Sequence, residues 1–228
     1  MLIIPRILCF LVDFSLSIAY NVVGKPKPLL RGSNMDKLKI SKMSGKLDGI
    51  RALNTDTVSN PFCQGMRKCA ANICAQCYSD NMLRTFRKNC RPAFQYNGGL
   101  LSSDTDYPLN LRDDIFRISA HGELINYNHA RNIMHIIKSN PDTFFAFWTK
   151  RPALVQKFIR AHGKPANVNL IYSNPKTDTV ADLPGYFDKV FNVHTTDNGD
   201  INCGARSCRG CMLCYTRNDT VQVHELVK

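Results

Sequence analysis

Residues 143–163 read TFFAFWTKRPALVQKFIRAHG and hold a strand-turn-helix pattern. Thr143 to Trp148 is rich in β-branched and aromatic side chains, which indicates a buried strand. Pro152 is favoured at the first position of a helix, and Gly163 is typical of its end. The apolar residues between them have helical spacing: Leu154, Val155, Phe158 and Ile159. The segment therefore predicts one strand followed by one helix, the unit of parallel sheets.

The same alternation continues on both sides of this segment. Ile115 to Ser119 reads as a strand, and Val168 to Tyr172 and Lys189 to Val193 read as two more. Apolar residues recur with helical spacing at Ala130, Ile133, Met134 and Ile137, which predicts a helix before residue 143. Pro141 ends this predicted helix.

Farther upstream, Leu47 to Leu53 predicts a first strand and Ser79 to Asn89 a helix. This gives roughly five or six βα units, fewer than the eight of a closed barrel. The predicted fold is α/β: a partial, open parallel βα barrel with the cysteine-rich loops at the carboxyl edge of its strands.

Nine of the ten cysteines fall in two groups, and each group contains the sequence Cys-x-x-Cys-Tyr. Close spacings of two and four residues let several thiolates converge on a metal or an iron-sulfur cluster. The chain length and the uneven clustering argue against a disulfide framework. The predicted metal ligands are Cys63, Cys69, Cys74, Cys77, Cys203, Cys208, Cys211 and Cys214.

The first group supplies three or four ligands, and the spacing leaves open which of Cys63 and Cys69 is used. Three cysteines on a cluster leave one iron accessible to a small molecule, whereas four close the site. In the second group, two successive x2 gaps up to Cys214 resemble ferredoxin-type spacing and are hard to satisfy around one zinc ion. Iron-sulfur is the leading interpretation, and zinc is the alternative.

Polar residues follow the predicted strands, at the edge where parallel α/β folds build their sites. Arg117 and Glu123 form a charged pair around Gly122. Glu123 could bind an ammonium group, and Gly122, which has no side chain, could let a ligand approach the backbone. Alternatively, the segment is a tight turn whose acidic residue caps a helix. Lys150 stands where an anionic substrate or cofactor would bind, unless it is simply solvated.

The formal net charge of +12 indicates an anionic partner such as nucleic acid, but the basic residues are scattered along the sequence. Cysteine ligation implies a reducing compartment, so we expect a cytoplasmic protein without integral membrane association. Residues 1–34 are apolar, then basic and proline-rich, and are interpreted as an extension, a hydrophobic leader or a misassigned start. Residues 35–218 form the predicted domain, and residues 219–228 a tail.

Several motifs together resemble the phage-encoded "gene product eighty-eight" family over about residues 36 to 218. They are Cys74-Ala75-Gln76-Cys77-Tyr78-Ser79, the segment Arg117 to Asn126, Asn140-Pro141 followed by Phe145 to Arg151, and Cys208 to Tyr215. The family is found in phages and prophages, so the resemblance implies a protein of the host-cell cytoplasm. It implies no settled activity.

A more distant resemblance is to radical S-adenosylmethionine enzymes. It implies that Cys69, Cys74 and Cys77 hold a cluster and that Gly122 and Glu123 hold the methionine amino group. The chain departs from that pattern, because the spacing is x4-x2 in place of x3-x2, the aromatic residue follows the last cysteine, and His121 replaces the first glycine.

Two function hypotheses follow. The first is an iron-sulfur protein with one or two [4Fe-4S] clusters, of radical S-adenosylmethionine-like or redox type, acting on an unknown small molecule or macromolecule. The second is a zinc-stabilised basic protein without enzymatic activity that binds nucleic acid or a host protein.

Overall fold

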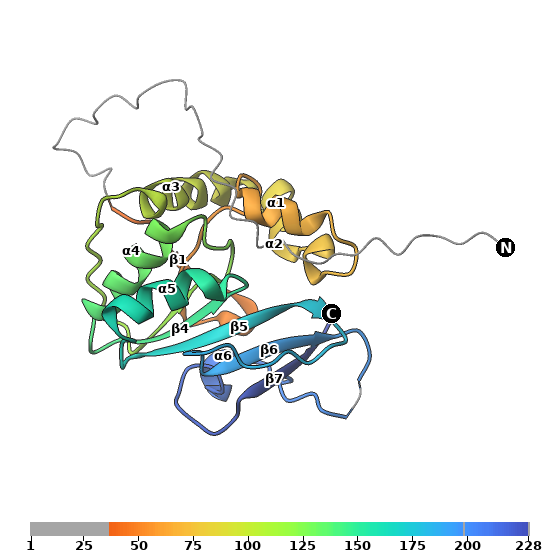
Figure 1. Ribbon diagram of the computed structural model, residues 1–228. Helices are drawn as coiled ribbons and strands as arrows, with labels where there is room; N and C mark the ends of the chain where they lie inside the picture. Colours follow the sequence, from red (N-terminus) through yellow and green to blue (C-terminus); the bar gives the residue numbers. More distant parts are fainter. Residues whose placement is uncertain (1–36, 198, 228) are drawn as a thin grey trace. The chain divides into compact units, whose positions relative to one another are not determined.

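A seven-stranded open sheet organises the computed structural model, which describes residues 37–197 and 199–227 (Figure 1). The strands follow one another in chain order across the sheet. β1 pairs antiparallel with β2, and every later pair is parallel. The strands are β1 (Ile40–Lys42), β2 (Arg51–Leu53), β3 (Ile115–Ile118), β4 (Phe144–Thr149), β5 (Val168–Thr177), β6 (Lys189–His194) and β7 (Gln222–Leu226). The predictions made for residues 1–34 lie outside the described residues.

Three helices cover one face of the sheet: α3 (Arg91–Ser102), α4 (Tyr127–Lys138) and α5 (Pro152–His162). Side chains alternate along a strand, so every second residue of β3, β4 and β5 faces these helices. Burying an aliphatic or aromatic side chain of this kind contributes about 1.5–3 kcal/mol. The residues of this core include Phe116, Ile118, Phe145, Phe147, Leu170, Ile133, Ile137 and Phe158.

The opposite face of the sheet is covered by the chain between β6 and β7, which includes α6 (Cys208–Cys211). Ala146 and Trp148 of β4 and Ile171 of β5 form the sheet side of this second core. Cys214 and Tyr215 pack on them from the covering segment, which we call the inner segment (residues 203–220).

The connection between β2 and β3 carries most of the remaining helical turns, whereas η1 (Gly45–Leu47) lies between β1 and β2. They are α1 (Pro61–Arg67), η2 (Ile73–Gln76), α2 (Tyr78–Arg84) and η3 (Lys88–Cys90), ahead of α3. The predicted cysteine-bearing loop after the first parallel strand is thus a folded helical excursion.

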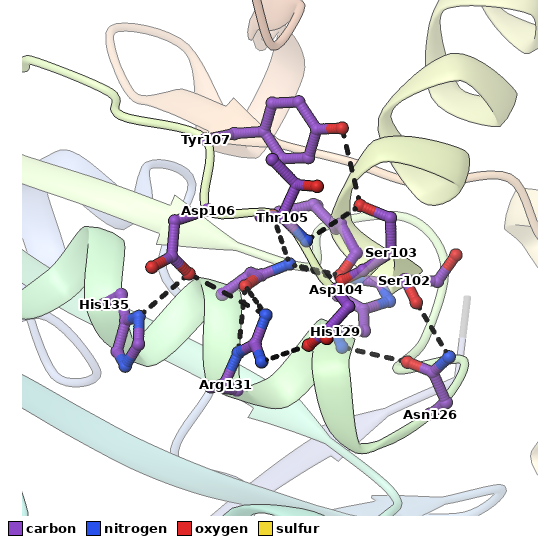
Figure 2. A network of polar contacts seen from close by, with 12 residues as sticks. Ser102, Ser103, Asp104, Thr105, Asp106, Tyr107, Asn126, His129, Arg131 and His135 are labelled. Atoms are coloured by element: carbon purple, nitrogen blue, oxygen red, sulfur yellow. Dashed lines mark hydrogen bonds and ion pairs between the residues drawn. The ribbon is translucent and has the colours of Figure 1, made fainter. Parts of the chain in front are cut away.

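Polar contacts hold the chain after α3 against α4 (Figure 2). Arg131 pairs with Asp104 at 2.6 Å, and the His135 ring nitrogen lies 3.0 Å from Asp106. The Asn126 side-chain amide donates to the Ser102 carbonyl at 2.9 Å. These contacts fix the long return from α3 to β3.

The mixed α/β fold and its mostly parallel sheet are confirmed, as are the predicted helices that became α4 and α5. The strand predicted over 47–53 is limited to Arg51–Leu53, because residues 45–47 form η1. The helix predicted over 79–89 ends at Arg84, after which Thr85 leaves helical geometry. Residues 222–226, placed in a tail by the sequence, form β7 and pair with β6.

Gly122 brings the loops after β2 and β3 together. Its φ is +83°, and a Cβ added there would lie 2.2 Å from Thr55 Oγ1 and 2.4 Å from the Thr55 carbonyl oxygen. The Thr55 amide donates to the His121 carbonyl at 3.1 Å, which closes the contact. Thr55 therefore fills the space that the sequence interpretation reserved for a ligand beside Gly122.

We expect Gly122→Ala to lower the free energy of unfolding by about 2–4 kcal/mol, since it adds left-handed backbone strain and a clash with main-chain atoms. Urea denaturation measures the change. Gly99→Ala in α3 is the matched control, because a Cβ there meets no atom within 4 Å and alanine suits a helix interior. A Gly122→Ala protein as stable as the control would contradict this account of the loop.

Candidate metal centre

Three cysteines of the first group belong to consecutive helical turns and act on one another's charge, and we call them the edge thiols: Cys63 in α1, Cys74 in η2 and Cys77 at the start of α2. Burial raises the pKa of each of them. The carboxylate of Glu123 and the other two edge thiols raise the pKa of Cys63 further. Charges act this way only at short range in a protein, so the edge thiols and Glu123 share one environment.

Asn60 sets the position of Cys63. Its side-chain oxygen accepts from the backbone amides of Phe62 and Cys63 and so caps α1. Its side-chain amide donates to the Glu123 carbonyl at 2.8 Å. One asparagine thus ties the start of α1 to the loop that follows β3.

Asp80 ties α1 to α2. Its carboxylate is fully buried and pairs with Arg67 of α1 and, at 2.6 Å, with Arg84 of α2. The Gln64 side-chain amide donates to the same carboxylate at 2.9 Å. Since a buried carboxylate is costly unless it is paired, this network fixes the distance between the helices that carry Cys63 and Cys77.

The Glu123 carboxylate joins the ends of β3 and β4. Oε1 accepts from the Leu124 amide at 2.8 Å and from the Thr149 hydroxyl at 2.6 Å, and Oε2 accepts from the Lys150 amide at 2.6 Å. A carboxylate offers about four acceptor positions, so internal donors take most of them. Glu123 caps no described helix, because Asn126 caps α4, and its carboxylate instead joins the loops after β3 and β4.

Lys150 is the cation that acts on all three edge thiols, and Arg67 also lowers the pKa of Cys77. The Lys150 ammonium group donates to the Ser173 hydroxyl of β5 at 2.7 Å. Its charge lowers the pKa of all three edge thiols, against the effect of burial. Glu123 and Lys150, which the sequence singled out together, both act on Cys63 and Cys74.

Arg117 belongs to a different environment. It projects from β3 onto the inner face, where its guanidinium lies 3.7 Å from the centre of the Trp148 ring and 3.4 Å from the Tyr215 hydroxyl. Burial raises the pKa of Cys208 and Cys214, and the charge of Arg117 lowers it. The structure separates Arg117 from the Glu123 and Lys150 set with which the sequence grouped it.

The second cysteine group is built around three half-buried or buried thiols, which we call the inner thiols: Cys203, Cys208 and Cys214. Burial raises the pKa of each, that of Cys214 to about 12. Lys46 donates to the Cys203 sulfur at 3.2 Å and to Glu225 at 2.9 Å. Cys211 lies exposed in α6.

The prediction that both cysteine groups meet at the carboxyl edge is wrong for the second group. Arg209 pairs with Asp114, which directly precedes β3, and Asn169 near the start of β5 donates to the Cys214 carbonyl at 3.1 Å. Figure 1 shows α6 near the starts of β5 and β6, whereas α1 and α2 lie toward the ends to which the arrows point. The inner segment folds back because side chains of the sheet donate hydrogen bonds to its carbonyl groups.

Cys69 lies between α1 and η2, where its carbonyl accepts from the Asn72 amide at 3.0 Å. Within residues 37–197 and 199–227, no three histidine, cysteine, aspartate or glutamate side chains stand in the ligand geometry of a single metal ion. The assignment of the cysteines as ligands therefore stays a prediction.

Sequence reasoning missed two residues of these sites, Lys46 and Asp80. Lys46 lies 157 positions before the cysteine that it contacts, and no local pattern connects the two. Asp80 has one available signal, its spacing of four residues from Arg84 on α2.

A protein-family model described as Gene product 88 matches residues 28–219. No curated protein and no solved structure matched the chain. Among the described residues, no helix is long and apolar enough to span a bilayer.

We expect Lys150→Met to raise the pKa of the three edge thiols and so slow their alkylation at pH 8.5, because the thiolate is the reactive form. The loss should be roughly three- to tenfold in metal-free, reduced protein, as one pKa unit is a tenfold change in thiolate. Mass spectrometry of iodoacetamide-treated protein gives the rate at each cysteine.

Lys46→Met is the matched control, since Lys46 lowers the pKa of Cys203 and Cys208. It should slow those two thiols and leave Cys63, Cys74 and Cys77 unchanged. Equal slowing of both groups by either variant would show that they form one electrostatic environment.

Proposed function

This chain belongs to the Gene product 88 family, and we propose that it is an iron-sulfur protein whose edge thiols hold a cluster. The observation that supports this most is the gathering of Cys63, Cys74 and Cys77 beside Lys150. In this proposal the open sheet acts as a partial barrel, and the cluster lies at its carboxyl edge.

The electrostatics of the edge thiols favour a positively charged centre. Burial raises the pKa of all three, so in the metal-free protein they are held as neutral thiols. Metal ions bind thiolates and displace the protons, and the charge of the metal offsets the repulsion that three neighbouring thiolates would have. Lys150 and Arg67, which is already paired with Asp80, cannot neutralise three thiolates, and iron would supply the remaining charge.

The two networks described above make the edge thiols suitable ligands. Asn60 fixes the start of α1, and Asp80 holds α1 against α2. Because the described thiols do not stand in ligand geometry, cluster binding would turn the cysteine side chains toward one another while these networks hold the helices in place. Three protein ligands would leave one iron open, next to the Lys150 ammonium group, for a small anionic molecule.

The inner thiols and the exposed Cys211 supply the second, auxiliary centre of the proposal. Cys203, Cys208 and Cys214 have positive neighbours in Lys46 and Arg117. The two successive x2 gaps in this group favour a cluster over zinc, which these donors would also suit. Zinc in either site, in a protein without enzymatic activity, is the competing proposal.

The radical S-adenosylmethionine-like reaction is the narrower part of the proposal. Gly122 packs against Thr55, and Glu123 already accepts from three internal donors. The methionine ammonium group would therefore have to use the remaining acceptor position of Glu123 or the carbonyls of this loop. A redox function of the cluster does not require that contact.

Anaerobic purification with iron, acid-labile sulfide and zinc analysis tests the cluster. We expect brown protein with iron and sulfide in about equal amounts. Cys74→Ala and Cys77→Ala should each lose roughly half of the iron, because the inner centre remains. Cys90→Ala, which changes a cysteine that is not among the predicted ligands, is the matched control and should keep all of the iron.

Comparison of Cys63→Ala with Cys69→Ala identifies the remaining ligand. Loss of the edge cluster in Cys63→Ala alone supports the three-thiolate site, and loss in both indicates a closed four-cysteine site. Colourless protein that holds only zinc after attempted reconstitution would overturn the cluster in favour of the zinc alternative.

The narrower reaction is tested by incubating the reduced, cluster-loaded protein with S-adenosylmethionine and measuring its reductive cleavage. We expect cleavage to be abolished in Cys74→Ala and Cys77→Ala. Cleavage that survives both changes would contradict the radical-type reaction. The cluster itself would still be tested by the metal analysis.

A further inference from the structure

The surface formed by α2 and the turn after it exposes two aromatic rings. Tyr78 is 66% exposed and Phe86 is 68% exposed, and their ring centres lie 6.4 Å apart. Large rings are normally buried, so a neighbouring pair left in water marks a surface that contacts something else.

The same surface is strongly basic. Between residues 57 and 103 the sequence has six lysines and arginines and one acidic residue, Asp80. Asp80 is buried and paired with Arg67 and Arg84, so it offers no negative charge to solvent. Lysine and arginine are as frequent here as in the whole chain, so the net positive charge of this stretch comes from its lack of exposed acidic residues.

Four cations belong to the same stretch of chain as the exposed rings, residues 78–91. Arg84, Lys88 and Arg91 line one hollow with Leu83, Asn89 and Pro92. Arg87 reaches the Ser44 hydroxyl at 3.1 Å. We call Tyr78, Phe86 and these four cations the α2 face.

The cations are available to a polyanion. Arg84 and Arg91 each meet a buried carboxylate on one side, Asp80 and Asp56, while much of each side chain remains exposed. In the described part of the chain, no carboxylate pairs with Lys88. Phosphate groups are the anions that arginine forks and lysine ammonium groups bind in nucleic acids.

We propose that the α2 face binds single-stranded nucleic acid. Unpaired bases stack on exposed aromatic rings, and the backbone phosphates pair with the four cations. In a duplex the base faces are already stacked, so Tyr78 and Phe86 could not be used in that way. An acidic protein surface would match the cations and leave the two rings unexplained.

This inference goes beyond the proposed iron-sulfur function and does not depend on it. Phe86, Arg87 and Lys88 follow α2 and are not among the residues that act on the edge thiols. Binding can therefore be measured on protein with or without a metal centre. Failure of one proposal leaves the other untouched.

The test is fluorescence anisotropy of the full chain with labelled oligothymidylate and oligouridylate of about 20 nucleotides, long enough to cover one binding surface. We expect at least one of the two strands to bind at about 50 mM salt, more tightly than a duplex of the same length, and to weaken as salt rises. No binding of either strand, or equal binding of the duplex, would overturn the proposal.

Variants then place the contact on the α2 face. Phe86→Ala should weaken binding roughly tenfold through lost stacking. Lys88→Glu should weaken it and reduce the salt dependence by roughly one counterion. Arg160→Glu makes the same charge change on the exposed surface of α5 and should have a much smaller effect.

Thermal unfolding of each variant verifies that it is folded, which we expect because the Phe86 and Lys88 side chains are exposed. Unchanged affinity in Phe86→Ala, or a loss in Arg160→Glu as large as that in Lys88→Glu, would contradict a binding site on the α2 face.

Discussion

The buried carboxylate of Glu123 is the contact on which the carboxyl edge depends. Its oxygens accept from Leu124, Thr149 and Lys150, so the loops after β3 and β4 are held together. Its carbonyl accepts from Asn60, which caps the helix that carries Cys63. Glu123 therefore positions both Cys63 and Lys150, whose charge counteracts the effect of burial on the pKa of Cys63. Leaving the donors of Glu123 unpaired would cost about 1–3 kcal/mol each.

The inner face carries a second polar system that is independent of Glu123. Asn169 donates to the carbonyls of Cys214 and Thr216, and Lys189 donates to Asn218 and to the Thr220 carbonyl. These bonds hold the inner segment across the starts of the strands. The charge of Arg117 lowers the pKa of Cys208 and Cys214 on the inner face. It also lowers the pKa of His121, for which burial is the larger cause. The two thiol groups are therefore separate sites that share one sheet.

Local pattern was sufficient for the regular part of the fold. The segments that became β3, α4, β4, α5 and β6 have clear strand or helix periodicity, and the structure places them as predicted. β1 and β7 are short edge strands whose pairing depends on the rest of the sheet, so no local signal defines them. The position of Cys214 was missed for a related reason, because Asn169 lies 45 residues away in the sequence. Gly122 was recognised as special, but only the structure shows that Thr55 fills the space beside it.

The edge thiols and the α2 face are connected through Asp80. Tyr78 directly follows Cys77, and Arg84, which pairs with Asp80, also lines the basic hollow. A phosphate bound by Arg84 would compete with Asp80 for the same guanidinium, and the buried carboxylate would then rely more on Arg67 and Gln64. Because Arg67 and Gln64 belong to α1, that shift would be felt by the helix that carries Cys63. Asp80 therefore touches both the helix that carries Cys63 and the arginine that lines the basic hollow, a contact that neither proposal requires.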